Sequence, residues 1–336
     1  MGGILVARQD NVGDVLLAGP CVRAVAASGQ PVTLLTGPRG RAGADLLPGV
    51  NDVLTWCAPW IDPQPAPVSE SGVEEFVEET RARRFERALI LTSFHQSALP
   101  LALLLRLAGV PWVGAISDEY PGSLLDLRHR VPGDPPESER ALSLAIAAGY
   151  RLPDGDDGGL SVRRPLPEVG HLTGEPGYLV LHPAASVPAR QPTAEHSAAM
   201  VAALAAAGHR VVVTGAKSER ELTAAVAAGH ATDLGGVTTL PELAAVLDRA
   251  SVVVAPNTGP AHLAAAVGTP VVSLFAPVVP AARWAPYRVP SVLLGDQSAP
   301  CRGSRARTCP VAGHPCLESI NPNEVVAATE ELAARR

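Results

Sequence analysis

The sequence predicts an α/β protein built from two doubly wound, Rossmann-like domains facing a central cleft. Apolar segments of strand length alternate with helical segments, which is typical of a parallel sheet covered by helices on both faces. The alternation weakens between residues 130 and 175, where Pro, Gly and acidic residues accumulate, and then restarts. A chain of 336 residues is long enough for two such domains.

The first domain is expected over residues 1–170. The segment 4–8 (ILVAR) reads as a buried parallel strand because its apolar run is continuous. The segment 14–28 reads as a helix ended by Gly29. Further strands are expected over 31–37, 52–56, 88–93 and 110–116. Further helices are expected over 73–87, which is charged and amphipathic, and 99–109, which is apolar.

The second domain is expected over residues 171–336, after Pro- and Gly-rich stretches at 131–140 and 151–177 that read as linker and surface loop. Its strands are predicted over 178–184, 209–216 and 251–256, with a further apolar strand near 270. Its helices are predicted over 196–208, 219–229 and 238–250. For the last helix, packing on the first domain is an alternative to packing within the second. Ligands of such sheets bind beyond the carboxyl ends of the strands, so the loops after strands are the places to search.

The composition of the chain argues against several classes of protein. A net charge of −6 argues against a nucleic-acid-binding protein. No run of 18 apolar residues is present, and no charged segment followed by an apolar one opens the chain, so we expect a cytoplasmic protein without a transmembrane segment, compatible with peripheral membrane contact. Five cysteines, an odd number, do not indicate a secreted disulfide scaffold.

The most informative segment is SVVVAPNTGPAHLAAAVGTPVVSLF, a strand, a small-residue turn, a short helix and a second strand. Its turn holds Asn257, Thr258, Gly259 and Pro260, with His262 directly after. Glycine lets a ligand approach the backbone, and the N–H groups that open a helix bind phosphate, so a nucleotide diphosphate fits here. The alternative is an ordinary turn capped by Asn257 or Thr258. His262 fits either a phosphate contact or simple packing.

The loop RQDNVGDV at 8–15 follows the first strand and opens the first helix. Asp14 is a candidate general base, or an acceptor of a hydrogen bond from a sugar hydroxyl. An acidic residue is equally expected in a first helical turn because it complements the helix dipole. Asp10 and Asn11 fit turn and capping positions.

Two loops of the second domain carry polar residues after predicted strands. In HPAASVPAR (182–190), Ser186 and Arg190 are candidates to contact a diphosphate, with Arg190 neutralising the charge of a leaving group. The alternative is a surface arginine beside a Pro-rich turn. In TGAKSERE (214–221), Lys217, the only lysine, and Glu221 could contact a ribose or base, although solvated residues at a helix start are the favoured interpretation.

The C-terminal segment contains Cys301, Cys309, His314 and Cys316. Four potential ligands invite a zinc interpretation. Their spacing does not match the short knuckles of common structural zinc sites, so packed thiols are favoured and no metal ligand is assigned.

Taken together, these motifs resemble those of glycosyltransferase family 9. The matching segments are R-x-D-N-x-G-D-V-L-L at 8–17, H-P-A-A-S-V-P-A-R at 182–190, T-G at 214–215, the long segment at 257–277 and C-P-x-x-x-H-P-C-L-x-x-I at 309–320. The resemblance covers nearly the whole chain, and the segment at 257–277 is its most specific part.

The resemblance implies a GT-B fold, with the acceptor bound by the first domain and a nucleotide-sugar by the second. It also implies transfer with inversion and no covalent intermediate, with Asp14 as the base. ADP-heptose is the implied donor. The donor-binding residues expected on this basis are Ser186, Arg190, Thr214, Gly215, Asn257, Thr258, Gly259, Pro260 and His262. The acceptor-binding residues expected are Asn11, Gly13, His95, Gln96, Asp118 and Tyr120.

Two positions depart from the family pattern. Many members of the family have an aspartate at the position of Asn257. An amide lacks the charge of a carboxylate, so contacts with the donor's hydroxyl groups or assistance by a metal ion can differ, and a dependence on Mg²⁺ stays open. Arg190 lies near the position where many members of the family have a lysine. Arginine keeps the positive charge, but its side chain has a different reach. No tightly bound cofactor is expected. The sequence does not exclude GDP or UDP donors, and the acceptor is a glycan, a glycolipid or a secondary metabolite. The alternatives are a sugar-nucleotide 2-epimerase and a non-catalytic nucleotide-sugar-binding protein.

Overall fold

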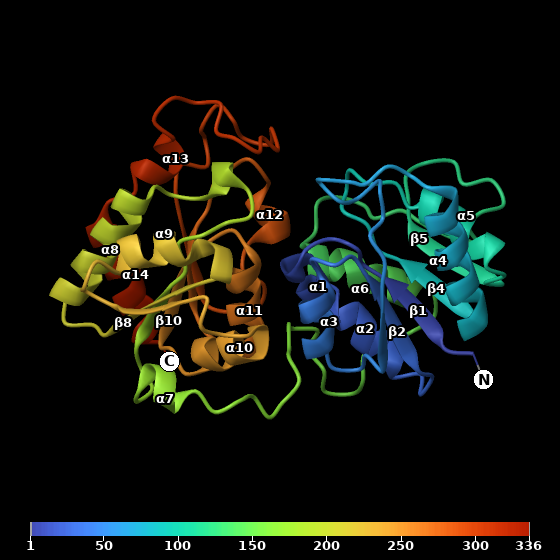
Figure 1. Cartoon of the computed structure of the whole chain (residues 1–336), viewed down its shortest axis with the longest axis horizontal. Helices are drawn as coiled ribbons and strands as arrows, with labels where there is room; N and C mark the ends of the chain where they lie inside the picture. The colour runs from blue at the N-terminus through green and yellow to red at the C-terminus, as the bar shows by residue number, and fades with distance from the viewer. Residues whose placement is uncertain (1, 336) are drawn as a thin grey trace. The chain divides into compact units, whose positions relative to one another are not determined.

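The computed structural model describes residues 2–335 and divides into two compact units (Figure 1). We call the residues up to Val162 the first unit and the residues from Arg163 onward the second unit. The sequence predicts the division after residue 170, and the contacts divide the chain after Val162 instead.

The first unit contains one parallel six-stranded sheet. Its strands are β1 (Ile4–Ala7), β2 (Val32–Thr36), β3 (Asp52–Thr55), β4 (Arg87–Ile90), β5 (Trp112–Ile116) and β6 (Leu127–His129). Their spatial order is β3-β2-β1-β4-β5-β6. The central strands are almost wholly buried, as expected of apolar runs covered on both faces.

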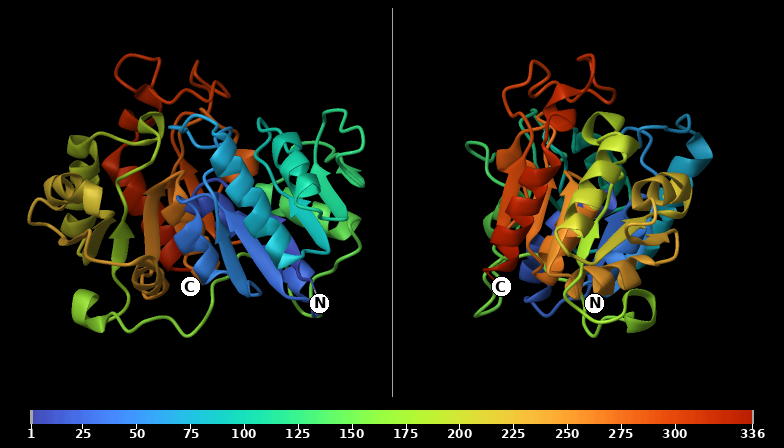
Figure 2. Two further views of the ribbon diagram at one scale, coloured as in Figure 1. Left: turned by 45° about the vertical axis from the view of Figure 1, so that its right-hand side comes forward. Right: turned by 90° about the vertical axis from the view of Figure 1, so that its left-hand side faces the viewer.

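Helices cover both faces of this sheet (Figure 2). They are α1 (Val12–Leu17), α2 (Gly19–Ala26), α3 (Arg41–Leu46), α4 (Glu70–Arg83), α5 (Leu99–Leu107) and α6 (Glu137–Ala147). Helices α1, α2, α3 and α6 pack against one another, and α4 pairs separately with α5. The helix predicted over 14–28 is two helices that meet at Ala18, because Pro20 lacks the N–H that would continue the first one.

Helix α6 corrects the interpretation of 131–140 as a linker. Pro136 precedes the helix as its N-cap, and the residues after it bury one face at helical spacing. Ala141, Leu144 and Ala145 form the apolar part of this face. Pro is common at a helix start, so the Pro-rich stretch marks where α6 begins as well as where a loop ends.

The second unit repeats the same architecture. Its strands are β7 (Leu179–Leu181), β8 (Val211–Gly215), β9 (Thr232–Gly235), β10 (Val252–Pro256), β11 (Val271–Leu274) and β12 (Ser291–Leu294). They form a parallel sheet in the order β12-β11-β10-β7-β8-β9. Numbered within its own unit, each sheet therefore has the order 3-2-1-4-5-6.

The helices of the second unit also lie on both sides of its sheet (Figure 2). The α-helices are α7 (Gly170–Thr173), α8 (Ala194–Ala206), α9 (Arg220–Ala227), α10 (Leu240–Asp248), α11 (Gly259–Val267), α12 (Ala281–Trp284), α13 (Pro315–Glu318) and α14 (Pro322–Ala333). Two 3₁₀ turns are η1 (Pro188–Arg190) and η2 (Lys217–Glu219). The last helix, α14, packs on α8 and on β10, β11 and β12.

The shared strand order places one switch point in each sheet, where the first and fourth strands of the unit run side by side. In the first unit these strands are β1 and β4, and in the second they are β7 and β10. Loops that leave neighbouring strands here turn in opposite directions and open a crevice for ligands. The loops after these four strands are therefore the places where a ligand site is expected in each unit.

The chain that joins the units is fastened at both ends. In the first unit, Arg23 forms a bidentate pair with Asp156 at 2.6 and 2.9 Å and also donates to the Ser161 hydroxyl and the Gly159 carbonyl. The carboxylate of Asp156 has a lowered pKa, chiefly because Arg23 donates hydrogen bonds to it.

In the second unit, Arg164 pairs with Asp248 on α10, and Arg249 pairs with Glu168. The connection therefore consists of two stretches, each fastened to a different unit. None of the helices that the structure describes has both the length and the apolar composition needed to span a membrane.

Candidate functional site

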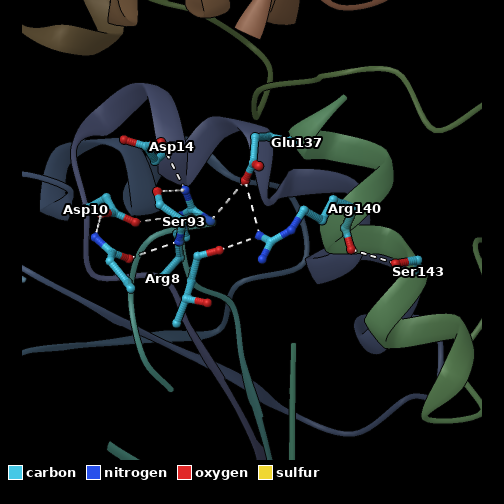
Figure 3. A network of polar contacts seen from close by, with 9 residues as sticks. Arg8, Asp10, Asp14, Ser93, Glu137, Arg140 and Ser143 are labelled. Atoms are coloured by element: carbon cyan, nitrogen blue, oxygen red, sulfur yellow. Dashed lines mark hydrogen bonds and ion pairs between the residues drawn. The ribbon is translucent and has the colours of Figure 1, made fainter. Parts of the chain in front are cut away.

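A buried arginine organises the switch point of the first unit (Figure 3). Arg8 follows β1 directly, and its side chain is 3% exposed. Its Nε lies 2.9 Å from Asp10 Oδ2, its Nη2 lies 3.0 Å from Asp14 Oδ1, and its Nη1 lies 3.5 Å from Glu137 Oε2. One guanidinium therefore holds three carboxylates that come from the first loop, α1 and α6.

The loop after β4 completes this arrangement. The Ser93 hydroxyl accepts a 3.0 Å hydrogen bond from Arg8 Nη2. Gln96 donates to Asp10 Oδ1 at 2.5 Å and accepts from the Ser93 backbone N–H at 2.9 Å. The loops that leave β1 and β4 are thus joined side chain to side chain at the predicted ligand end of the sheet. We call the six residues joined in this way the Arg8 cluster: Arg8, Asp10, Asp14, Ser93, Gln96 and Glu137.

The electrostatics of the cluster follow from burial and from the shared cation. Burial lowers the pKa of Arg8, but Asp10, Asp14 and Glu137 together outweigh burial and raise it above its ordinary value. Burial also raises the pKa of Asp10 to about 6, against the opposing effect of Arg8. Asp10 therefore takes up a proton under mildly acidic conditions, and Arg8 stays charged.

The other residues that the sequence predicts to bind an acceptor belong to the loops and the helix that follow β1, β4 and β5. Asn11 is the N-cap of α1 without a side-chain capping bond, and Gly13 is buried inside the helix. His95 and Asp118 are exposed, and Tyr120 is 86% exposed. Of the four residues proposed from the later loops, the structure brings Gln96 into the Arg8 cluster. The role of these residues in binding an acceptor stays a prediction.

Sequence reasoning missed the residues that surround Asp14. Arg8 stood in the quoted motif without a role, and Ser93, Glu137 and Arg140 were not considered. The usable signal was Arg8 itself, because a charge directly after a fully buried strand needs partners. Glu137 was hidden by the interpretation of its segment as a linker.

In the second unit, the turn after β10 opens α11 as expected. Thr258 is the N-cap of α11, and its side chain makes no capping hydrogen bond. Asn257 is 4% exposed. Its Nδ2 donates to the Ala276 carbonyl and its Oδ1 accepts from the Ala276 N–H, both at 3.4 Å. The alternative of a helix capped by either side chain is therefore not the arrangement in the structure.

This pairing also gives a physical reason for asparagine at position 257. An amide both donates and accepts, whereas an ionised carboxylate only accepts. Aspartate at this position could not make the bond to the Ala276 carbonyl. Gly259 and Pro260 form the first helical turn, and His262 is 5% exposed inside α11. Their contact with a donor stays a prediction.

The loop after β7 is fixed by several contacts within its unit. His182 Nδ1 lies 3.1 Å from Thr214 Oγ1, and both residues are buried. Gln191 accepts from the Ala185 N–H, and His314 Nε2 lies 3.1 Å from the Ala189 carbonyl. These contacts hold the stretch that carries Ser186, which is exposed, and Arg190, which is half-buried on η1.

His182 makes the stability of the second unit depend on pH. Burial lowers its pKa from 6.5 to about 4. The neutral ring is thus favoured in the folded state, and its contribution is present above pH 6.5 and lost as the pH falls toward 4. We expect His182→Gln to remove about 2 kcal/mol of the wild-type loss of stability between pH 7 and pH 5.

Urea unfolding at both pH values, followed by circular dichroism, measures this difference. His230→Gln, on an exposed residue of the same unit, is the control. If His182→Gln and wild type lose the same stability on acidification, His182 is not the group responsible.

The loop after β8 contains Thr214 and Gly215. The Thr214 side chain is fully buried and engaged with His182, so its contribution to donor binding would be through the position of the loop. A Cβ on Gly215 would lie 2.5 Å from Thr223 Cγ2, which explains the glycine. Lys217 and Glu221 are exposed, which agrees with their interpretation as solvated residues at the start of a helix.

The C-terminal cysteines pack as thiols within the second unit. Cys301 and Cys316 are buried in its hydrophobic core, and Cys309 packs against that core. Burial, with Cys301 and Cys309 nearby, raises the pKa of Cys316 to about 11. Across residues 2–335, no three His, Cys, Asp or Glu side chains are arranged to hold a metal ion. His314 instead contacts the loop that carries Arg190.

Comparison with known proteins gives both sequence and fold relatives. Lipopolysaccharide heptosyltransferase 3 of Escherichia coli is 34% identical over 121 residues, which span 34% of this chain and 36% of that protein. The match thus covers about a third of that relative. The glycosyl transferase family 9 structure from Veillonella parvula has a TM-score of 0.78 at 18% identity, covering 100% of this chain and 98% of that one.

The structure of E. coli ADP-heptose lps heptosyltransferase II has a TM-score of 0.74 at 21% identity, with 99% of each chain covered. These likenesses, with two parallel sheets of one strand order, identify the fold as GT-B. Residues 73–313 match the model of glycosyltransferase family 9 (heptosyltransferase). Because that match extends over more than half of its sequence, the chain belongs to glycosyltransferase family 9.

Proposed function

We propose that this chain is an inverting glycosyltransferase that moves a heptose from ADP-heptose to a hydroxyl group of a glycan, glycolipid or secondary-metabolite acceptor. The first unit would bind the acceptor and the second unit the donor. The reaction would take place in the cytoplasm, with peripheral contact if the acceptor is a membrane lipid.

The observation that carries the proposal is the setting of Asp14. It stands at the switch point of the first unit, and Arg8 fixes one of its oxygens. Its side chain is 19% exposed, whereas those of Asp10 and Glu137 are 10% and 1% exposed. Among the three carboxylates on Arg8, Asp14 is therefore the one most open to a substrate hydroxyl.

The second unit supplies the features that a departing diphosphate needs. The N-terminus of α11 presents backbone N–H groups and the positive end of a helix dipole. Arg190 would neutralise charge on the leaving group. Both features belong to loops after β10 and β7, the neighbouring strands at the switch point of the second sheet.

In the proposed step, the acceptor oxygen forms a bond to the anomeric carbon as the bond from that carbon to the diphosphate oxygen breaks. Asp14 takes the hydroxyl proton, and ADP leaves with the electron pair of the broken bond. The transition state has oxocarbenium character, as in glycoside hydrolysis. Attack from the face opposite the leaving group inverts the anomeric configuration.

The name of the structurally similar E. coli heptosyltransferase II includes ADP-heptose, and this supports the choice of donor. The test is a screen of the purified full chain for binding and slow hydrolysis of ADP-heptose, GDP-mannose and UDP-N-acetylglucosamine. Each donor is measured with Mg²⁺ and with EDTA. We expect selective binding of ADP-heptose and release of ADP.

Each other outcome contradicts the proposal in a different way. A preference for UDP-N-acetylglucosamine with conversion to its 2-epimer would identify an epimerase. Donor binding without turnover, in the presence of a panel of glycan and lipid acceptors, would identify a binding protein. Selective turnover of GDP-mannose would support a glycosyltransferase but contradict ADP-heptose as its donor.

A further inference from the structure

The Arg8 cluster contains more negative than positive charge. Asp10, Asp14 and Glu137 contact Arg8, and Arg140 is the second cation, 3.5 Å from the same Glu137 oxygen that faces Arg8. Figure 3 shows Glu137 between the two arginines. Glu137 is thus the carboxylate that both cations share.

The other charged and polar groups around the cluster do not change this balance. Arg140 also donates to the carbonyl of Thr92, the residue before Ser93 in the loop after β4. His129 on β6 contacts Ser143 of α6, and burial together with the Arg140 cation lowers its pKa. The imidazole is therefore neutral at neutral pH. Gln96 and Ser93 contribute hydrogen bonds without charge.

This arrangement addresses a chemical conflict in a base held by a cation. A guanidinium that fixes a carboxylate also stabilises its ionised form and so weakens it as a proton acceptor. Additional carboxylates on the same guanidinium act in the opposite direction, because like charges disfavour ionisation. The strength of Asp14 as a base then depends on the carboxylates behind it.

We propose that Glu137 is a positioning residue that acts on Asp14 through Arg8: with Asp10, it shares the Arg8 cation, so that Arg8 orients Asp14 while the negative charge of Glu137 opposes the effect of that cation. The inference rests on the proposed role of Asp14 as the base. Glu137 is 1% exposed, which separates it from the substrate and makes its influence electrostatic.

Glu137→Gln tests the proposal because it removes the charge and keeps the shape. We expect the measured Asp14 titration to lie at lower pH in this variant than in the wild type, since a nearby negative charge is lost in a partly buried site. Glu139→Gln is the matched control, because Glu139 lies on the same helix and is exposed. It should leave the titration of Asp14 unchanged.

The measurement is a pH titration of the full chain labelled with ¹³C at the aspartate carboxyl carbons, with the Asp14 signal identified by its loss in Asp14→Asn. Asp10→Asn is a second variant that should shift the Asp14 titration in the same direction. It keeps the test open if Glu137→Gln does not fold. An unchanged or upward-shifted titration in the folded variants overturns the proposal.

Turnover is measured separately, as ADP released from ADP-heptose across the same pH range. In Glu137→Gln the acid limb should move to lower pH and the plateau should fall about threefold, as expected of a weaker general base. A shifted titration in a protein that releases no ADP supports the sharing of charge and contradicts the proposed function. Normal turnover with an unshifted titration supports the proposed function and contradicts the sharing of charge.

Discussion

Replacing Arg8 with methionine should lower the free energy of unfolding of the first unit by about 3–5 kcal/mol. The change removes the guanidinium that contacts Asp10, Asp14 and Glu137 together, and leaves those carboxylates facing one another in a buried site. Methionine has a similar length, so the loss reflects uncompensated charge more than an empty volume. Protonation relieves repulsion between carboxylates, so the loss should be smaller at pH 5 than at pH 8.

Tryptophan fluorescence during urea unfolding measures this effect. Three of the four tryptophans, Trp56, Trp60 and Trp112, lie in the first unit, so the signal reports mainly on it. Arg83→Met is the control, since Arg83 pairs with Asp52 and Glu79 at the surface. Exposed pairs contribute less than about 1 kcal/mol. Equal losses in the two variants would mean that the Arg8 cluster has no special weight in the fold.

Replacing Asp14 with asparagine should reduce transfer by about 10²–10⁴-fold, the usual contribution of a general base. Asparagine keeps the size of the side chain, and its carbonyl oxygen can still accept from Arg8 Nη2. It cannot take up the proton of an attacking hydroxyl. The affinity for the donor should stay unchanged, because the proposed donor loops belong to the second unit.

The measurement is a comparison of kcat and donor Kd for wild type, Asp14→Asn and Asp45→Asn. Asp45 lies on α3 of the same unit and pairs with Arg41 at the surface, so its variant should behave as wild type. A rate within tenfold of wild type in Asp14→Asn would assign the base elsewhere. Loss of donor binding together with rate would indicate a disturbed fold.

The fold was largely predictable because its strands are continuous apolar runs separated by helices. The sheet centre, with β1, β4, β7 and β10, follows from segments whose residues are buried on both faces. The short edge strands β6, β9 and β12 were missed, since their sequences are less apolar and partly exposed. Helix α6 was missed because Pro and acidic residues before a helix resemble a linker.

The candidate site was predictable only where local sequence determines it. A loop after a strand can be recognised from the chain, so the places of Asp14 and of the turn at 257–260 beyond the ends of β1 and β10 were predicted, while their roles stay predictions. The partners of Asp14 could not be found in this way. Glu137 meets Arg8 through a helix that returns to the sheet more than a hundred positions later. Likewise, the bond between Asn257 and Ala276 depends on two neighbouring strands.

The connection between the units is fastened on both sides of the unit boundary. Arg23 ties the chain through Ser161 to the first unit, and Arg164 ties the next stretch to the second. The stretch between these two fastened segments is therefore short, and it contains Val162 and Arg163. Because the last helix belongs to the second unit, the chain crosses between the units once. A single crossing also means that each six-stranded sheet is formed from one continuous stretch of the chain, without a strand from the other unit.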